Sequence, residues 1–178
     1  VSEKHLYDLC LKVRAGQARS LPAHDYEKEL QTAKENIEAL HEIGIALSSE
    51  NDPDKLLELI LTQSRNIAGA DAGSLYLLEG ENQLRFKLSQ NVSLDWSVKE
   101  NSVLPVDGHS ICGYTASAKE AVNLLDTYDI PPAFSFTFNK SYDQKSGYRS
   151  KSMLAVPMRN KSGEVLGVIQ LINKRADY

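Results

Sequence analysis

The residues whose types could do chemistry gather in one loop, residues 143–150. Asp143 offers a carboxylate, and Ser146 and Ser150 offer hydroxyls, just before the apolar run at residues 153–158. Short apolar runs of this kind are typical of strands buried on both faces. A polar loop that enters a buried sheet can supply hydrogen bonds beside an apolar floor, which is how small-molecule sites are usually built. The loop therefore indicates the wall of a binding pocket rather than a catalytic centre.

Two apolar runs near the end of the chain predict an antiparallel hairpin. Residues 153–158 and 165–172 are the strands, and residues 160–164 have the composition of a turn in which Gly163 can take a positive φ. Pro157 has no N–H to donate to a strand ladder, so it indicates an edge position or a bulge.

These residues resemble the GAF domain family, the small-molecule-sensing modules of cyclic-nucleotide phosphodiesterases and many bacterial signalling proteins. The pattern D-x-x-[ST]-G-[YF]-[RK]-[ST], an apolar strand ending in a proline, and N-x-x-G-E-V-[IL]-G-V-x-x-[LV]-x-N-K are met almost position for position from Asp143 to Lys174. A looser likeness begins at about Ala46. The resemblance implies an α+β fold with a mostly antiparallel central sheet, helices on one face and a roofed pocket on the other.

The resemblance also implies which residues hold a ligand. Family members that bind cyclic nucleotides use the first strand, the end of the second strand, the start of a roof helix, the loop before the hairpin and the last strand. The matching positions here are Ser74, Ser89, Gln90, Ile111, Cys112, Asp143, Ser146, Ser150 and Gln170. Ser89 and Gln90 replace an aromatic-acidic pair, and Gln170 replaces an acid. These departures argue that the site does not recognise its ligand in the way that relatives usually recognise cyclic GMP.

The loop from residue 128 to residue 143 is longer than in those relatives. It carries Phe134, Phe136 and Phe138 in alternation with smaller polar residues. Two interpretations stay open: a hydrophobic lid over the ligand, or a short extra strand packed on the core.

The rest of the chain predicts a helix, strands, a short helix and further strands. Asp52 is a residue type that caps helix starts, and Pro53 is favoured at the first helical position. Gly69 is a residue type that ends helices, so a helix is expected between these residues. Strands are expected at residues 74–78, 84–88, 102–106 and 122–125, with a short helix at 108–118 and a loop from 127 to 145. This order is typical of an α+β sandwich.

A heptad pattern precedes this domain. Its apolar seam consists of Tyr26, Leu30, Ala33, Ile37, Leu40, Gly44 and Leu47. A seam with a 3.5-residue period favours pairing with a second copy of the helix over an ordinary amphipathic surface helix, although both interpretations stay open. We expect an N-terminal appendage at 1–25, with a short helix at 7–13, a signalling and dimerisation helix at 26–50, and a GAF domain at 51–178.

Composition limits the partners. The chain has 178 residues, of which 42% are hydrophobic, and a formal net charge of −4 without a dense basic run. Nucleic acid and anionic membranes are therefore not expected as partners. No apolar stretch approaches the roughly 18 residues of a membrane span, so we expect a cytoplasmic protein. The start at Val1 and the stop just after the last expected strand indicate a piece of a longer protein, with the terminal helix truncated.

Nucleophiles and metal ligands are few. Cys112 follows His109 near the start of the expected roof helix, where the positive helix end could lower the thiol pKa and support redox chemistry. A small buried core residue is the simpler interpretation. The four histidines show no ligand spacing, so no metal and no cofactor are expected.

The sequence therefore favours a non-catalytic sensor domain. The primary hypothesis is that it binds a small ligand, with a cyclic nucleotide as the candidate, and relays occupancy through a homodimeric helix to an output domain elsewhere. The alternatives are a structural dimerisation module with a degenerate pocket and a thiol redox enzyme that uses Cys112.

Overall fold

The computed structural model describes residues 23–99 and 102–175. The helix expected at residues 7–13 lies outside the described residues. The chain divides into two compact units, residues 1–48 and 49–178, and each is described by itself.

The first unit contains the long helix α2 (Ala23–Ser49). It includes the whole heptad segment, which confirms the prediction of a helix there. Three apolar seam side chains are exposed: Leu30 by 59%, Ile37 by 66% and Leu40 by 59%. Ile45, which lies off the seam, is exposed by 57%.

The second unit begins with helix α3 (Pro53–Ala68), whose ends follow the sequence signals. The Asp52 side chain accepts a hydrogen bond from the Asp54 N–H at 2.9 Å, and Pro53 opens the first turn. Gly69 closes the helix in the left-handed conformation, with φ 60°, and donates its N–H to the carbonyls of Arg65 and Asn66. Both caps confirm the prediction, because each needs only local residue types.

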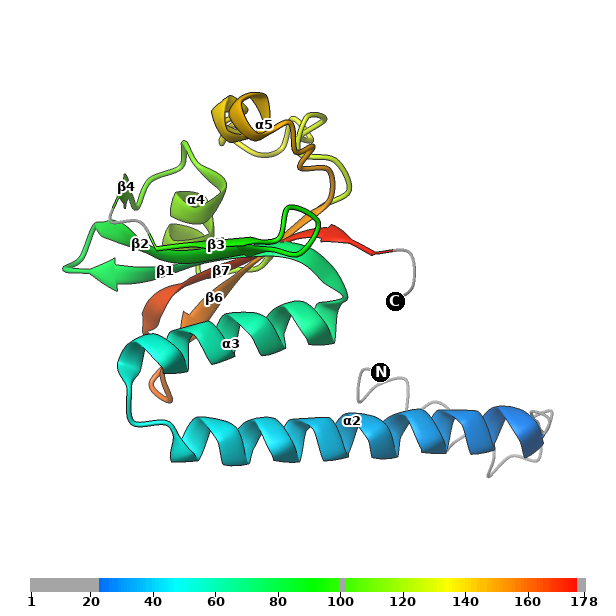
Figure 1. Cartoon of the computed structure of the whole chain (residues 1–178). Helices are drawn as coiled ribbons and strands as arrows, with labels where there is room; N and C mark the ends of the chain where they lie inside the picture. The colour runs from blue at the N-terminus through cyan, green and yellow to red at the C-terminus, as the bar shows by residue number, and fades with distance from the viewer. Residues whose placement is uncertain (1–22, 100–101, 176–178) are drawn as a thin grey trace, which may run out of the picture. The chain divides into compact units, whose positions relative to one another are not determined.

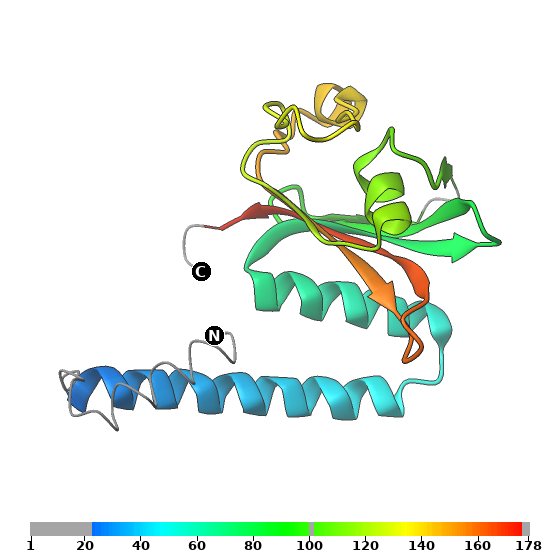
Figure 2. The ribbon, with the colours of Figure 1, turned by 180° about the vertical axis from the view of Figure 1, so that it is seen from behind.

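The described residues form one seven-stranded sheet in the order β3-β2-β1-β7-β6-β5, with β4 also paired to β2. Every strand pairing in it is antiparallel. The strands are β1 (Ala70–Glu79), β2 (Gln83–Asn91), β3 (Trp96–Val98), β4 (Val103–Pro105), β5 (Val122–Leu124), β6 (Met153–Arg159) and β7 (Val165–Lys174). Helix α3 covers one face; α4 (Ile111–Ala118) lies over the other, with α5 (Ser141–Ser146) farther out (Figures 1 and 2).

The predicted hairpin is confirmed as β6 and β7. Gly163 has φ 85°, as the turn requires. Pro157 lies beyond the last pairing between β5 and β6, so its missing N–H faces an unpaired edge. Two elements were not predicted: β3 lies between the strands expected at residues 84–88 and 102–106, and α5 lies inside the segment expected to be a loop up to residue 145.

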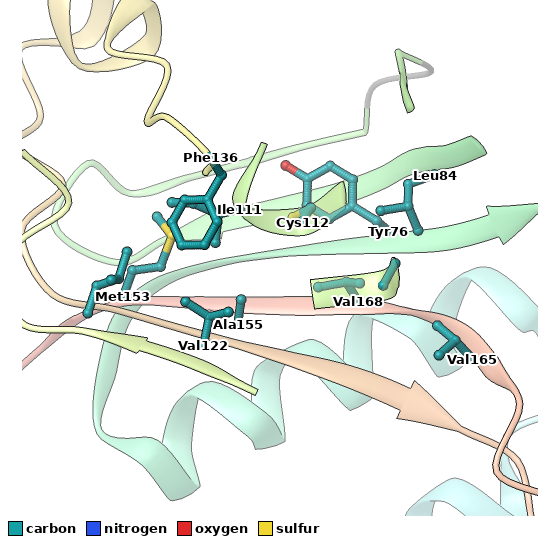
Figure 3. Close-up of a cluster of buried hydrophobic side chains, with 12 residues drawn as sticks. Tyr76, Leu84, Ile111, Cys112, Val122, Phe136, Met153, Ala155, Val165 and Val168 are labelled. Atoms are coloured by element: carbon teal, nitrogen blue, oxygen red, sulfur yellow. The ribbon is translucent and has the colours of Figure 1, made fainter. Parts of the chain in front are cut away.

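Two apolar clusters fill the two faces of the sheet. The cluster under α3 contains Leu61, Leu75, Leu88 and Ile169. The cluster under α4, which we call the roof cluster, contains Tyr76, Leu84, Ile111, Cys112, Ala116, Val122, Leu124, Phe136, Met153, Ala155, Val165 and Val168 (Figure 3). The roof cluster borders the candidate site.

Candidate functional site

The centre of the sheet carries a row of three polar residues on neighbouring strands. Ser74 on β1 is paired with Ser89 on β2 and with Gln170 on β7. Directly opposed residues share a sheet face. Tyr76 and Val168 belong to the roof cluster and lie two residues from Ser74 and Gln170, so the row faces α4. The structure therefore brings these three predicted residues together, and we call them the polar row.

The side chains of the polar row are poorly satisfied. Ser74 is only 7% exposed, and neither its hydroxyl nor that of Ser89 has a hydrogen-bond partner among the described residues. The Gln170 amide accepts from the Tyr76 hydroxyl at 3.5 Å and donates to the Met153 sulfur at 3.4 Å. Both contacts are weak, because one is long and the other ends on a poor acceptor. The row can still bind a polar group.

Gln90 lies on the opposite face and does not join the row. Its Oε1 accepts from Arg65 Nε at 3.0 Å, and its Nε2 donates to Thr62 Oγ1 at 3.0 Å. Both partners belong to α3. Successive side chains of a strand point to opposite faces, so Ser89 and Gln90 cannot both face one pocket. The prediction of Gln90 as a ligand-binding residue is therefore not supported by its placement.

The start of α4 roofs the apolar side of the site. Ser110 caps the helix by accepting the Gly113 N–H at 3.0 Å. Ile111 and Cys112 are buried in the roof cluster beside Tyr76 and Met153 (Figure 3). The side chains of Ile111 and Cys112 therefore contribute packing.

Burial raises the pKa of the Cys112 thiol, and a hydrogen bond from Tyr76 opposes that rise only in part. The expectation that the helix start lowers this pKa is wrong, because desolvation penalises the thiolate more than the helix end favours it. A buried thiol that stays protonated is a poor nucleophile, so the structure does not support redox chemistry at Cys112.

The three predicted loop residues hold the loop itself. Asp143 is buried: its Oδ1 accepts the Ser150 hydroxyl at 2.8 Å, and its Oδ2 accepts the Ser150 N–H at 2.8 Å and the Tyr128 hydroxyl at 3.1 Å. The Ser146 hydroxyl donates to the Tyr142 carbonyl at 2.9 Å and accepts the Tyr148 N–H at 3.2 Å. These groups fix the loop that carries α5; Asp143 and Ser150 are buried, whereas Ser146 is partly exposed.

The phenylalanine loop packs on the roof cluster without forming a strand. Phe136 is buried in that cluster, and its ring lies 4.8 Å from that of Phe134 and 5.0 Å from that of Tyr114. Thr137 makes a single isolated bridge, with Ser110. The core-packing interpretation is therefore correct for Phe136, but the extra strand is absent from the described residues.

A buried acidic residue was missed by the sequence analysis. The Asp71 carboxylate accepts the Tyr148 hydroxyl at 2.8 Å and the Ser93 hydroxyl at 2.7 Å. Burial and the hydrogen bond to Asp71 raise the pKa of Tyr148. Through these contacts the loop after α5 is attached to the start of β1. An aspartate inside the otherwise apolar start of a strand was the signal that could have revealed it.

Two further features, a metal site and a membrane-spanning helix, are absent from the described residues. Across residues 23–99 and 102–175, no three His, Cys, Asp or Glu side chains come together as a metal site. No helix in this part of the chain has the length and apolar character to cross a membrane.

The sheet, its two helical layers and the loop motif agree with one family. Residues 52–178 match the family model described as GAF domain. The chain belongs to the GAF domain family. GAF domains are regulatory sensor modules that bind small ligands, so the second unit is a regulatory domain.

Known relatives extend far beyond this GAF domain. The chain is 31% identical over 138 residues to the cGMP-specific 3',5'-cyclic phosphodiesterase of Drosophila virilis. This alignment covers 72% of the chain and 15% of that protein. The chain is 29% identical over 148 residues to the dual 3',5'-cyclic-AMP and -GMP phosphodiesterase 11 of Drosophila melanogaster, covering 77% of the chain and 10% of that protein. The chain thus spans a small part of these relatives.

The fold of this GAF domain also resembles that of a solved structure. The GAF domain from Acinetobacter phosphoenolpyruvate-protein phosphotransferase superposes with a TM-score of 0.57 at 20% identity, covering 78% of this chain and 77% of that one. At this identity the likeness establishes the fold alone.

Proposed function

We propose that this GAF domain is a cytoplasmic sensor that binds a small molecule over the polar row, with a cyclic nucleotide as the first candidate. The observation that carries the proposal is the Ser74 hydroxyl. Its residue is only 7% exposed, and the hydroxyl makes no hydrogen bond within the described part of the chain, although its oxygen is not among the fully buried atoms that lack a partner. A polar group in so enclosed a position is nearly always hydrogen-bonded to protein, water or ligand. A bound ligand would supply that partner.

The relatives support the nucleotide as candidate. Both phosphodiesterases named above act on cyclic nucleotides by name, and residues 52–178 of this chain match the GAF domain model. The polar row offers hydroxyl and amide groups, which pair with the edge of a base. The start of α4 would supply N–H groups to an anionic ligand atom.

We propose that ligand occupancy reaches an output domain through α2 paired with a second copy of itself. The exposed apolar seam residues Leu30, Ile37 and Leu40 support such pairing. A ligand can transmit a signal only if it binds one helix arrangement more tightly than the other. Ligand binding and helix pairing must therefore be coupled.

Titration calorimetry and thermal-shift measurements against cyclic AMP, cyclic GMP and other nucleotides test the binding proposal. Ser74→Ala removes the buried hydroxyl and should weaken binding about 2- to 10-fold, the usual range for one hydrogen bond. Ser97→Ala is the matched control: it changes an exposed serine of β3 whose hydroxyl makes no hydrogen bond within the described residues, and it should leave affinity unchanged. A wild-type protein that responds to no nucleotide would rule out the nucleotide version.

A second candidate function is a dimerisation module that binds no ligand. It is favoured by the internal bonds of Asp143, Ser146 and Ser150 and by the Phe136 side chain in the roof cluster. Under this hypothesis the protein gives a dimer mass in solution and no thermal shift with any small molecule.

A further inference from the structure

Asn91 is the buried polar residue that the site description leaves unexplained. It ends β2 and is 4% exposed, and its Nδ2 is buried with no hydrogen-bond partner among the described residues. Its Oδ1 accepts the Leu94 N–H at 2.9 Å. Because that backbone N–H requires an acceptor, the side-chain orientation is fixed, and the group left over is the NH₂ donor.

Asn91 lies on the same sheet face as the polar row. It is two residues from Ser89, and alternation places it opposite to Gln90, whose contacts are with α3. It pairs with Ala72 on β1, which in turn pairs with Ile172, a residue packed against the roof cluster. Asn91 therefore extends the polar row by one position.

The Tyr142 hydroxyl is one group that could use the Asn91 donor. Burial raises the pKa of Tyr142, and a weak hydrogen-bonding interaction with the Asn91 side chain, the smallest of the causes, works against that rise. The two groups do not meet the distance and angle of a full hydrogen bond, so Nδ2 has no such partner among the described residues. An unmade hydrogen bond on a buried amide is costly, so its retention calls for a partner outside the described residues.

We propose that Asn91 donates a hydrogen bond from Nδ2 to an acceptor atom of the bound ligand. This inference rests on the proposed function, because it requires a ligand over the polar row. All four polar side chains of this floor, Asn91, Ser89, Ser74 and Gln170, are neutral. Asn91 offers only a donor, so this floor binds an uncharged, planar heterocyclic part of the ligand, which presents a carbonyl oxygen or ring nitrogen at the β2 end.

The test is calorimetric titration of wild type, Asn91→Ser and Asn91→Asp with cyclic GMP and with cyclic AMP. In both variants the side-chain oxygen can still accept the Leu94 N–H, while the NH₂ donor is gone. We expect at least one probe to bind wild type, and the Asn91→Ser variant to bind it about tenfold more weakly. Asn91→Asp should weaken it further, because its carboxylate repels a ligand acceptor.

Matched controls are Asn123→Ser and Asn123→Asp, which change an exposed strand asparagine and should leave affinity unchanged. The ligand-free melting temperature of Asn91→Ser should stay within ~3 °C of wild type. Unchanged affinity in Asn91→Ser overturns this inference and leaves the proposed function standing. If the ligand-free melting temperature of Asn91→Ser falls further while its affinity is unchanged, the role of Asn91 is to hold Tyr142, and the inference is also overturned. Absence of binding to wild type overturns both. Should Asn91→Asp fail to fold, Asn91→Ser alone decides.

Discussion

Asp143 illustrates how a residue with ligand-binding chemistry can serve the fold. Its two carboxylate oxygens receive three hydrogen bonds, from the Ser150 N–H, the Ser150 hydroxyl and the Tyr128 hydroxyl. Arg149 stacks 3.5 Å from the Tyr128 ring centre and also pairs with Asp126 at 2.8 Å. The loop that carries α5 is thus fixed by a network around one buried carboxylate.

Asp143→Asn should destabilise the domain by about 1–3 kcal/mol. The amide can no longer accept all three hydrogen bonds, so at least one buried donor loses its partner. Urea unfolding followed by circular dichroism measures the change, and Asp129→Asn, at an exposed aspartate of the same loop, is the control. Equal stability of the two variants would contradict the structural role of Asp143.

Cys112 should be inert as a thiol in the folded protein. Burial raises its pKa, so almost no thiolate is present near neutral pH. In a Cys10→Ser background, where Cys112 is the remaining cysteine, reaction with Ellman's reagent at pH 8 should be more than ~100-fold slower in native buffer than in denaturant. Rapid reaction of the native protein would show that the thiol is accessible and return redox chemistry to consideration.

At the scale of elements, the proposed pairing of α2 depends on its apolar seam. Ile37→Asp and Leu40→Asp should weaken a dimer by about 3 kcal/mol or more, over ~100-fold, because each buries a carboxylate in an apolar seam. Sedimentation equilibrium measures the association constant. Ile45→Asp is the matched control, since Ile45 is exposed to a similar degree but lies off the seam. An unchanged mass in all three variants would remove the pairing role of the seam.

The sheet elements show where sequence reasoning succeeds and where it fails. The caps of α3 and the turn of the β6–β7 hairpin were predicted because Asp52, Pro53, Gly69 and Gly163 act within a few residues of themselves. Strand β3 was missed because its three residues gain their order from pairing with β2, which lies outside any local window. Gln90 was predicted from its family position, but strand alternation places its side chain opposite to that of Ser89, in contact with α3.

At the scale of the whole molecule, the two compact units have separate proposed roles: the first pairs with a second copy, and the second binds the ligand. A variant of residues 49–178 should fold, keep the nucleotide affinity of the full chain and sediment as a monomer, since the seam lies in the unit that is removed. At ligand concentrations 100 times the Kd, binding should stabilise both forms by about 2.7 kcal/mol. Calorimetry and sedimentation on the same samples measure this, and loss of affinity in the shorter form would mean that the first unit contributes to the site.

The sequence by itself determined the family, the order of the main elements and the chemistry of the polar row. Each of these depends on residue types and short spacings, such as the motif from Asp143 to Lys174. Only the tertiary structure decided which polar groups already have hydrogen-bond partners within the protein. Asp143 and Ser146 have partners within their own loop, whereas the Ser74 hydroxyl and the Nδ2 of Asn91 have none in the described residues. The physical reason is that hydrogen-bond satisfaction depends on groups brought together by folding, and spacing along the chain does not encode it.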